Sequence, residues 1–579
     1  MTLVDILRDH AIKQPNAIAF RFHPTNAGAP TNITFLELYR RSLAWAARIS
    51  GETHVSDRVL IALPSGIEYL VAFFGCLLSK RIAVPHYPPR LNATSTRHLN
   101  RLQAIAHDCT PALALGPAGF DIRFRRTVST VPELSGLRWL SVDSAIAEAP
   151  AVPDAPRERP TDDDVALLQY TSGSTREPRG VIISHENLRR NLALCARAFR
   201  VGRNSILSGW LPLFHDMGLI GLALQAVYSG CPYVFMPPSS FIQRPLSWLR
   251  LLSEARATCT GAPNFAFELC ADRITADVKE TLDLSSVDMM FCGAEQIRPA
   301  SLHRFIRACE PFALKRSAIA PGYGLAEATL VVSLDTGARG PNVADRPAGE
   351  IWRGKNLHVP VVDCGEVQPE YRIAIVDPTT KQDLEPGAIG EIWLAGQCVS
   401  RGYWGEPNKS QDVFGNALSD SDERSWLRTG DLGFLRGRHL FVTGRLKDII
   451  AEGNAYRLPD AIENTVLTAS EFIEPNGTAA FGLANDQGTR VVIVAEIRRA
   501  ARNGDMSLLP SILADAIFEA HGIANCDIVL TPPRCLPRTT SGKLQRSQCR
   551  SLYEHDQLPV IARLRRAKEF KTNSAALDG

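Results

Sequence analysis

The sequence has few of the features that mark secreted, membrane or cysteine-rich proteins. Its thirteen cysteines form no C-x-x-C pair, which argues against a disulfide framework and against a cysteine-rich zinc site. The N-terminal segment, MTLVDILRDHAIKQ, lacks the continuous apolar core and the cleavage site of a secretory signal. The longest apolar run covers the ten residues 69–78 and is too short to cross a bilayer of about 30 Å as a helix. We therefore expect a protein of the reducing cytoplasm that has no transmembrane segment.

A strong charge of one sign is missing as well. The formal net charge is +3, with 22% charged and 45% hydrophobic residues, which is the composition of an ordinary globular protein. This balance does not imply a nucleic-acid partner. Because 579 residues are too many for one compact core, two or more domains are expected.

The order of the apolar segments indicates an α/β fold. Strand-like runs at residues 59–63 and 233–236 alternate with amphipathic helical stretches at residues 67–78 and 186–199. This alternation is typical of mostly parallel sheets.

The pattern changes after Asp363. Short strands separated by turn residues predict a β-rich subdomain over about residues 363–445. Mixed α and β signals return beyond it, so we place a domain boundary between a large domain, 1–445, and a small domain, 446–579. From Leu564 onward, the polar sequence predicts a helix followed by a frayed tail.

The most informative segment is residues 167–185, LLQYTSGSTREPRGVIISH. An apolar run of strand character leads into small, hydroxyl-bearing residues, and β-branched residues follow them. Small side chains let backbone N–H groups approach anionic oxygens, and an arginine supplies a cation. The order differs from the Walker G-x-x-x-x-G-K-[ST] loop, and a solvated Ser/Thr/Gly connector is the alternative. The residues assigned to phosphate binding are Thr171, Ser172, Gly173, Ser174, Thr175 and Arg179.

Five further segments follow in a fixed order: WLPLFHDMGLIG, FCGAEQI, PGYGLAEATL, LRTGDLGFL with TGRLKDII, and PRTTSGKLQR. Together the six resemble the adenylate-forming enzymes, the superfamily of acyl-CoA synthetases, peptide-synthetase adenylation domains and luciferases, over essentially the whole chain. The resemblance implies a large N-terminal domain of α/β subdomains with the β-rich subdomain, followed by a small mobile α+β domain. It also implies ATP and Mg²⁺ as cofactors.

Within this superfamily, the local sequences look like the fatty acyl-AMP ligases, which adenylate fatty acids and hand them to acyl carrier proteins. The likeness lies in Arg179 in place of a lysine, in VPHYPPR near Pro85 and in PRTTSGKLQRSQCR. That branch carries an insertion that discriminates against CoA, and residues 335–361 lie at the corresponding place. An acyl-CoA synthetase with the same first half-reaction is the alternative.

The resemblance implies three groups close to the reacting atoms. Lys543 is similar to the catalytic lysine that bridges the carboxylate and the α-phosphate, and Glu327, with Thr171, would serve Mg²⁺. His215 resembles the residue beside the acyl carboxylate. The alternatives are a solvated lysine, a carboxylate favoured at a helix N-terminus, and a His-Asp metal site, for which the sequence shows no second cluster.

Further residues match positions that bind the nucleotide. Tyr323 offers a flat face for adenine, Asp431 would accept hydrogen bonds from the ribose hydroxyls, and Arg445 would contact ribose and phosphate. Packing is the alternative for Tyr323, and turn stabilisation is the alternative for Asp431. The other residues assigned to this site are Gly293, Ala294, Glu295 and Gly324.

Apolar residues surround His215 in the sequence and are numerous enough to wall an acyl tunnel. Ordinary core packing is the safer interpretation for most of them. They are Trp210, Leu211, Leu213, Phe214, Met217, Leu219 and Ile220.

The resemblance implies two partners, a fatty acid and a separate phosphopantetheinylated acyl carrier protein. Lys447 falls at the family's hinge, where rotation of the small domain admits the carrier thiol. Between Arg534 and Lys571, ten Lys or Arg face three Asp or Glu, which would suit an acidic carrier or form a solvated face. Arg176 and Glu177 depart from the usual loop, and a non-catalytic lipid or nucleotide sensor is a remote alternative.

Overall fold

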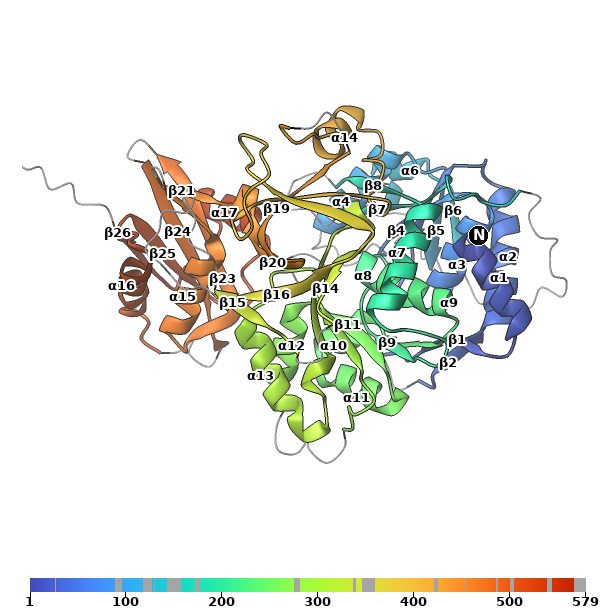
Figure 1. Cartoon of the computed structure of the whole chain (residues 1–579), viewed down its shortest axis with the longest axis horizontal. Helices are drawn as coiled ribbons and strands as arrows, with labels where there is room; N and C mark the ends of the chain where they lie inside the picture. The colour runs from blue at the N-terminus through green and yellow to red at the C-terminus, as the bar shows by residue number, and fades with distance from the viewer. Residues whose placement is uncertain are drawn as a thin grey trace, which may run out of the picture. The chain divides into compact units, whose positions relative to one another are not determined.

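The computed structural model describes most of the chain and divides it into two compact units (Figure 1). The first unit comprises described residues within 1–344, 361–429 and 433–442, and the second those within 345–360, 430–432 and 443–579. No helix among the described residues is long and apolar enough to cross a membrane. The described residues are 1–25, 28–88, 96–117, 128–129, 131–142, 158–171, 178–274, 282–336, 340–345, 360–420, 425–452, 455–485, 488–499, 504–538 and 544–566.

A six-stranded sheet carries the phosphate-loop segment. Neighbouring strands pair in parallel except for the last two, which pair antiparallel. Helix α3 (Ile67–Leu78) follows β3 and is buried along almost its whole length, because its sequence is apolar on nearly every face. The predicted strand at 59–63 and the predicted helix at 67–78 are confirmed. The strand order is β6 (Trp139–Val142), β5 (Leu113–Pro117), β3 (Arg58–Ala62), β4 (Ile82–His86), β7 (Val165–Tyr170) and β8 (Gly180–Ser184).

A 14-stranded sheet combines a parallel part and an antiparallel part. Strands β1, β10, β9, β11, β12 and β13 pair in parallel, whereas β13 with β14, β14 with β16, and β16 with β20 pair antiparallel. The region predicted to be β-rich therefore contributes antiparallel strands that continue a parallel sheet, and its limits as a subdomain stay a prediction. The order is β17 (Tyr371–Val376), β18 (Gly390–Gly396), β19 (Leu427–Arg436), β20 (His439–Arg445), β16 (Pro360–Val367), β14 (Val331–Leu334), β13 (Ile319–Gly324), β12 (Met289–Cys292), β11 (Cys259–Ala262), β9 (Leu207–Gly209), β10 (Tyr233–Phe235), β1 (Ile18–Phe22) and β2 (Thr31–Thr34), and β15 (Val343–Asp345) pairs with β16.

Helices of the first unit pack against these sheets. Helix α7 (His185–Ala198) begins directly after β8, and Ser184 caps it by accepting a hydrogen bond from the backbone of Asn187 at 3.1 Å. The other described helices include α1 (Leu3–Lys13), α2 (Phe35–Ser50), α4 (Thr96–Cys109), α6 (Pro132–Ser135), α8 (Asp216–Gly218), α9 (Gln225–Ser229), α10 (Pro238–Gln243), α11 (Leu246–Ala255), α12 (Asn264–Ala271), α13 (Pro299–Cys309) and α14 (Pro407–Phe414).

The second unit is built on a four-stranded sheet that has a helical layer on each face. Its strand order is β23 (Ile473–Asn485), β24 (Gly488–Ile497), β25 (Cys526–Thr531) and β26 (Ala562–Arg566), and a hairpin of β21 (Ile450–Glu452) and β22 (Ala455–Arg457) belongs to the same unit. Alternate residues of β24 pack into two different cores, as the period of a strand requires. The helices are α15 (Pro459–Ala469), α16 (Leu509–His521) and α17 (Arg546–Glu554).

The predicted helix from Leu564 is wrong at its start. Residues 562–566 form strand β26, which pairs antiparallel with β25. The sequence ARLRR alternates, and its arginines at 563 and 565 both contact Asp527 of β25. The rest of that prediction falls on residues 567–579, which lie outside the described residues.

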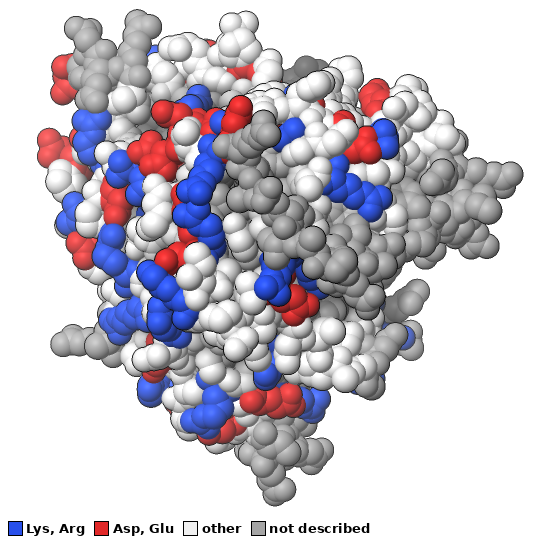
Figure 2. All heavy atoms as spheres, turned by 90° about the vertical axis from the view of Figure 1, so that its right-hand side faces the viewer, with Lys and Arg blue, Asp and Glu red and all other residues white. Residues whose placement is uncertain are grey.

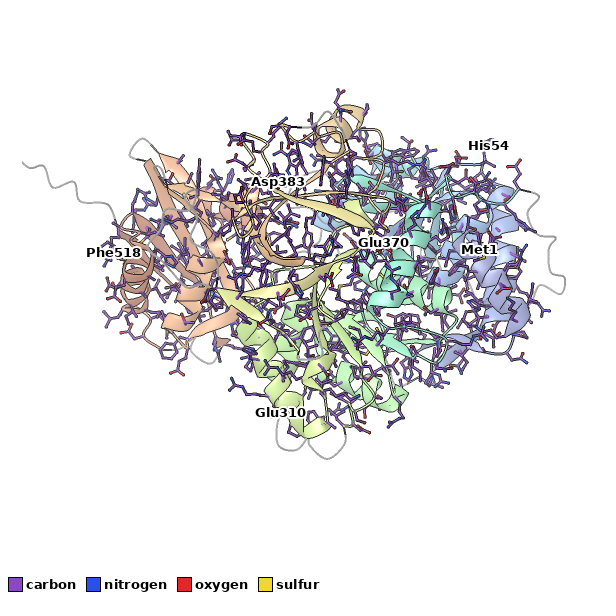
Figure 3. The ribbon with its side chains drawn as sticks, viewed as in Figure 1. Met1, His54, Glu310, Glu370, Asp383 and Phe518 are labelled. Atoms are coloured by element: carbon purple, nitrogen blue, oxygen red, sulfur yellow. The ribbon has the colours of Figure 1, made fainter. Side chains whose placement is uncertain are left out.

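The surface of the protein carries charged side chains of both signs (Figure 2), whereas its cysteines are almost all buried. Basic and acidic side chains are interspersed on the face shown in Figure 2. On the second unit, Phe518 of α16 projects outward and is 50% exposed (Figure 3). All thirteen cysteines lie in described residues and are free thiols, and all except Cys535 are buried.

Candidate functional site

Two antiparallel strands flank the phosphate-loop segment, as its sequence predicts. Strands β7 and β8 pair antiparallel from Val165 opposite Ser184 to Tyr170 opposite Gly180, and the amide of Thr171 donates to the carbonyl of Arg179 at 3.3 Å. Thr171 and Arg179 therefore face each other at the two ends of the turn. The assignments to Ser172, Gly173, Ser174 and Thr175 lie outside the described residues.

Arg101 of α4 contacts the first end of this turn. Its Nη2 donates to the carbonyl of Thr171 at 3.0 Å. Burial lowers the pKa of the Arg101 guanidinium, and no carboxylate among the described residues forms an ion pair with it. Arg101 is not among the predicted site residues, because nothing in the sequence around an arginine on an amphipathic helix indicates such a contact.

Glu327 lies in a short 3-10 helix, residues 326–328, directly after β13. Its Oε1 accepts a hydrogen bond from the Tyr403 hydroxyl at 2.9 Å, and its backbone carbonyl accepts one from the amide of Ser400 at 2.8 Å. Thr329, two residues later, is fully buried with φ of +70°, an unusual conformation for a β-branched residue. The carboxylate therefore projects from a turn whose backbone is held in a strained form.

Arg179 lies beside the same tyrosine. Its Cζ lies 5.6 Å from the centroid of the Tyr403 ring, and its Nε is 3.6 Å from Glu406 Oε2. Tyr403 thus brings together Arg179 and Glu327, which the sequence analysis assigned separately to phosphate and to Mg²⁺. Tyr403 is not among the predicted site residues. Its only local signal is that it is an aromatic residue in the turn-forming segment SRGYWGEP.

Two predicted nucleotide segments lie at the carboxyl ends of neighbouring parallel strands. Cys292 at the end of β12 pairs with Pro321 of β13, and the sites of ligands in α/β sheets commonly lie beyond such ends. Tyr323 is half-buried and pairs with Ser333, and Gly324 leaves no room for a side chain because a Cβ would lie 1.8 Å from the carbonyl oxygen of Leu330.

The segment from Gly293 to Glu295 follows β12. A Cβ at Gly293 would lie 3.1 Å from the carbonyl oxygen of Gly322, so the turns after β12 and within β13 are in close contact. Ala294 has a φ of +67°, and Glu295 Oε1 accepts a hydrogen bond from the amide of Phe265 at 2.7 Å. The structure therefore brings this segment and the Tyr323 segment together.

Asp431 and Arg445 are described within the second unit. Asp431 is buried in strand β19, and its Oδ1 lies 3.0 Å from Nε of the half-exposed Arg445. The alternative of a turn-stabilising aspartate does not apply, because Asp431 lies within a strand. Lys543 lies outside the described residues, as do residues 539–542.

His215 lies at the N-cap of α8, and its Nδ1 is 2.6 Å from Oδ1 of Asp216. The described residues contain no group of three or more His, Cys, Asp or Glu side chains that can hold a metal ion. Six of the seven apolar residues predicted to surround His215 are buried, and Phe214 is half-buried. Trp210 stacks on Phe241 with ring centroids 3.8 Å apart, so these residues form core packing in this structure.

Much of the basic C-terminal segment is engaged in ion pairs. Arg563 and Arg565 contact Asp527 at 2.7 and 3.0 Å, and Arg546 contacts Glu463 at 2.7 Å. These arginines stabilise the second unit, so the excess of basic residues in the sequence overstates the free positive charge on its surface.

Similarity to known proteins covers nearly the whole chain. Residues 7–404 match the AMP-binding enzyme family. The medium-chain-fatty-acid–[acyl-carrier-protein] ligase JamA of Moorena producens is 33% identical over 567 residues, which cover 95% of this chain and 94% of JamA. The putative fatty-acid–CoA ligase fadD25 of Mycobacterium tuberculosis is 32% identical over 580 residues, which cover 96% of this chain and 98% of that protein.

Solved structures show the same relationship. A structure from work on the fatty acyl-adenylate ligases of E. coli and L. pneumophila superposes with a TM-score of 0.84 at 30% identity and covers 96% of this chain and 98% of its own. The L. pneumophila fatty acyl-adenylate ligase in complex with acyl adenylate and pyrophosphate superposes with a TM-score of 0.72 at 31% identity and covers 97% of this chain and 98% of its own.

Proposed function

This chain belongs to the AMP-binding enzymes and, within them, to the fatty acyl-AMP ligases, and from this premise we propose that it converts a medium- or long-chain fatty acid and ATP to acyl-AMP and pyrophosphate. The observation that carries the proposal is the contact of Tyr403 with both Glu327 and Arg179 beside the phosphate-loop hairpin. The contact brings one carboxylate and one guanidinium to the same tyrosine, which supports their assignment to a cation and to a polyphosphate.

Adenylation joins two anions, because the fatty-acid carboxylate attacks the α-phosphorus of ATP while pyrophosphate leaves. Cations and hydrogen-bond donors must offset this repulsion in the transition state. In this proposal Arg179 and the turn after Thr171 bind phosphate oxygens, and Lys543 bridges the carboxylate and the α-phosphate. His215 orients the fatty-acid carboxylate.

The residues present fit Mg²⁺. This ion takes oxygen ligands, keeps several waters and is commonly bound by one or two carboxylates together with substrate phosphates. Glu327 offers such a carboxylate in the turn beside the hairpin. Bound Mg²⁺ would neutralise charge on the phosphates. Glu327 would orient it, with Thr171 at the start of the phosphate turn as a second oxygen donor.

The nucleotide base and sugar are assigned to the remaining predicted residues. Tyr323 would stack on adenine, with Gly324 and the segment Gly293, Ala294 and Glu295 lining the pocket, as their place beyond β12 and β13 supports. Asp431 would accept hydrogen bonds from the ribose hydroxyls, and Arg445, which already orients Asp431, would add a cation.

The acyl acceptor is the thiol of a separate phosphopantetheinylated carrier protein in this proposal. JamA, which matches nearly the whole chain, is named for transfer to an acyl carrier protein. CoA is the second candidate, because fadD25 matches over the same extent and is named as a putative CoA ligase. A boundary near Leu446, with rotation at Lys447, would let Lys543 act first and the thiol enter afterwards.

Two assays test the two half-reactions. The protein, ATP, Mg²⁺ and a panel of fatty acids should release pyrophosphate and yield acyl-AMP detectable by mass spectrometry, and Lys543→Ala should abolish this while retaining ATP binding. Holo-carrier or CoA is then added to the preformed acyl-AMP. Carrier thioester is the expected product; efficient acyl-CoA formation would support the second candidate. Binding of ATP and acid without acyl-AMP would support a sensor.

The proposed location is the cytoplasm. Thirteen free thiols suit a reducing compartment, in which cysteines remain unpaired. Labelling of the protein in fractionated cells would test this.

A further inference from the structure

Tyr403 connects two parts of the site that lie far apart in the sequence. Its hydroxyl donates to Oε1 of Glu327 at 2.9 Å, and its ring lies under the guanidinium of Arg179 at 5.6 Å. The residue is 8% exposed, and its ring also packs in a T-shaped arrangement against Phe414, with ring centroids 5.2 Å apart. Because this hydroxyl donates the hydrogen bond to Glu327, it acts as a neutral O–H group in this contact.

Tyr403 belongs to a segment, residues 397–406, that we call the strap. The strap pairs with β8, because the amide of Ile182 donates to the carbonyl of Gly402 at 3.0 Å and the amide of Trp404 donates to the carbonyl of Gly180 at 2.8 Å. One residue between them, Val181, forms a bridge with Tyr403 itself. The backbone of the strap is therefore joined to the phosphate-loop hairpin.

The strap is also joined to the turn that carries Glu327. The amide of Ser400 donates to the carbonyl of Glu327 at 2.8 Å, and the hydroxyl of Thr329 donates to the carbonyl of Cys398 at 2.7 Å. Thr329 is the residue with the positive φ of +70°, so this hydrogen bond helps to hold the strained turn.

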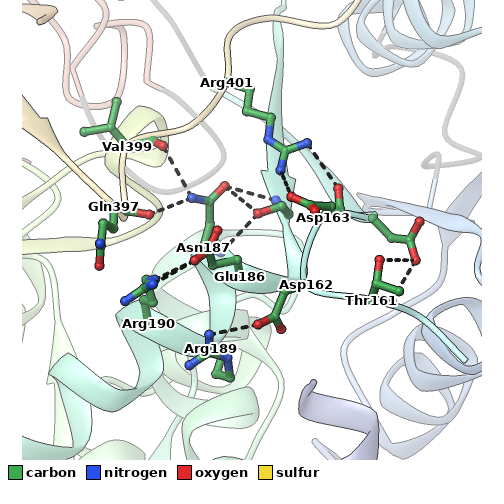
Figure 4. Close-up of polar contacts among 12 residues, drawn as sticks. Thr161, Asp162, Asp163, Glu186, Asn187, Arg189, Arg190, Gln397, Val399 and Arg401 are labelled. Carbon is green, nitrogen blue, oxygen red and sulfur yellow. Dashed lines mark hydrogen bonds and ion pairs between the residues drawn. The ribbon is translucent and has the colours of Figure 1, made fainter. Parts of the chain in front are cut away.

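Side chains of α7 and of the loop before β7 fix the strap from a third direction (Figure 4). Asn187 donates to the carbonyls of Gln397 and Val399 at 3.0 and 3.3 Å. Arg401 donates to Oδ1 of Asp163 at 2.8 Å. Because these contacts hold the strap without the Tyr403 hydroxyl, that hydroxyl can be removed while the strap stays in place.

We propose that Tyr403 is a positioning residue for adenylation, which aligns the Glu327 carboxylate through its hydroxyl and the Arg179 guanidinium through its ring so that both bind one Mg²⁺–polyphosphate. This inference rests on the proposed function of Glu327. A neutral hydroxyl orients a carboxylate without cancelling its charge, and an aromatic face holds a guanidinium without occupying its N–H donors. Both groups therefore keep their charge for the ligand.

Two substitutions separate the hydroxyl from the ring. Tyr403→Phe removes only the donor to Glu327, so the rate of acyl-AMP formation should fall about tenfold, the effect of one hydrogen bond to a charged group, and the Mg²⁺ concentration for half-maximal rate should rise. Tyr403→Leu also removes the aromatic face under Arg179. Its affinity for ATP should therefore fall both with Mg²⁺ and in EDTA, where no Mg²⁺ is available to Glu327. Calorimetric titration of ATP, with Mg²⁺ and with EDTA, reads both effects without turnover.

The matched control is Tyr553→Phe in the second unit, which also removes a hydroxyl that donates to a carboxylate, Asp527, at 2.6 Å. It should leave the Mg²⁺ dependence unchanged. In a Glu327→Gln background, Tyr403→Phe should have almost no further effect, because its target is already altered.

Independent, multiplying effects of Tyr403→Phe and Glu327→Gln, or a Tyr403→Phe enzyme with the wild-type Mg²⁺ dependence, would overturn the inference while leaving the proposed function intact. Failure of the wild-type protein to form acyl-AMP would contradict the proposed function itself. A fall in the melting temperature of Tyr403→Phe that matches its loss of activity would point to a purely structural role.

Discussion

Two groups of arginine, tyrosine and carboxylate in this molecule differ in what the arginine contacts. In the second unit, Arg563 lies over the ring of Tyr553 at 5.2 Å and also contacts Asp527 at 2.7 Å, with the Tyr553 hydroxyl donating to the same carboxylate. Arg565 adds a further contact at 3.0 Å. We call this the closed group, because its fully buried carboxylate is surrounded by its own donors.

In the first unit, the corresponding residues are Arg179, Tyr403 and Glu327. The tyrosine again donates to the carboxylate and lies under the arginine, but among the described residues the arginine has only Glu406, at 3.6 Å, as a carboxylate neighbour. We call this the open group. The comparison leads us to expect two roles for the same three side chains. They stabilise the fold where arginine and carboxylate bind each other, and they serve a ligand, as proposed for Arg179 and Glu327, where the tyrosine connects them.

The largest expected effect is on the stability of the closed group. Asp527→Ala removes the buried partner of two arginines and a tyrosine, so the free energy of unfolding of the second unit should fall by about 3–5 kcal/mol. Urea unfolding, monitored by hydrogen exchange of the amides in β25 and β26, measures this free energy. Glu327→Ala should lower the free energy of unfolding much less than Asp527→Ala does. Equal losses from the two substitutions would contradict the distinction between the closed and the open group.

The next effect is on catalysis by the open group. Glu327→Gln keeps the size of the side chain but removes its charge, so the rate of acyl-AMP formation should fall on the order of a hundredfold, as when a group that acts on transition-state charge is lost. The far-ultraviolet circular dichroism and the melting temperature should match those of the wild type. Near-normal turnover would assign Glu327 to structure alone.

A smaller effect separates the two arginines. Arg179→Gln should raise the KM for ATP about tenfold while changing stability little, because a phosphate contact is lost. Arg563→Gln should lower the stability of the second unit while leaving the KM for ATP unchanged. Steady-state kinetics and urea unfolding midpoints, measured on both variants, test whether the two arginines have these separate roles. A raised KM for ATP in Arg563→Gln would show that the closed group also serves the ligand.

The smallest effect is on the pH dependence of stability. Burial alone would raise the pKa of Asp527, but hydrogen bonds from Arg563, Tyr553 and Arg565 outweigh it and lower the pKa. Because the unfolded chain then binds the proton more tightly, the stabilisation present above about pH 4 is lost as the pH falls through the lower folded-state pKa. Unfolding at several acidic pH values measures this. Asp527→Asn should flatten that part of the profile, and an equally steep profile would point to other carboxylates.

The sequence predicted those parts of the open group that depend on neighbouring residues. The strands on either side of the phosphate turn follow from an apolar run, small residues and a β-branched run. Arg179 follows from its place at the end of that turn. Tyr403 does not, because its hydroxyl reaches a residue 76 positions away and the contact exists only once the strap is paired with β8.

In the closed group, by contrast, the sequence led to a wrong secondary-structure prediction. The polar sequence from Leu564 predicts a helix, yet residues 562–566 form an edge strand. Its arginines at 563 and 565 lie on the same side of the strand, as a period of two requires, and meet Asp527 there. The polarity of the sequence indicated exposure, whereas the partner that decided the structure was a buried aspartate on β25.

The burial of nearly every thiol allows the second unit to be labelled selectively with a fluorophore. Burial raises the pKa of all twelve enclosed cysteines, and the thiolate is the form that reacts with electrophiles. A maleimide dye should therefore attach chiefly to Cys535 in the native protein. No cysteine needs to be replaced for this labelling. The fluorophore would report on the second unit, whose rotation during turnover is proposed above.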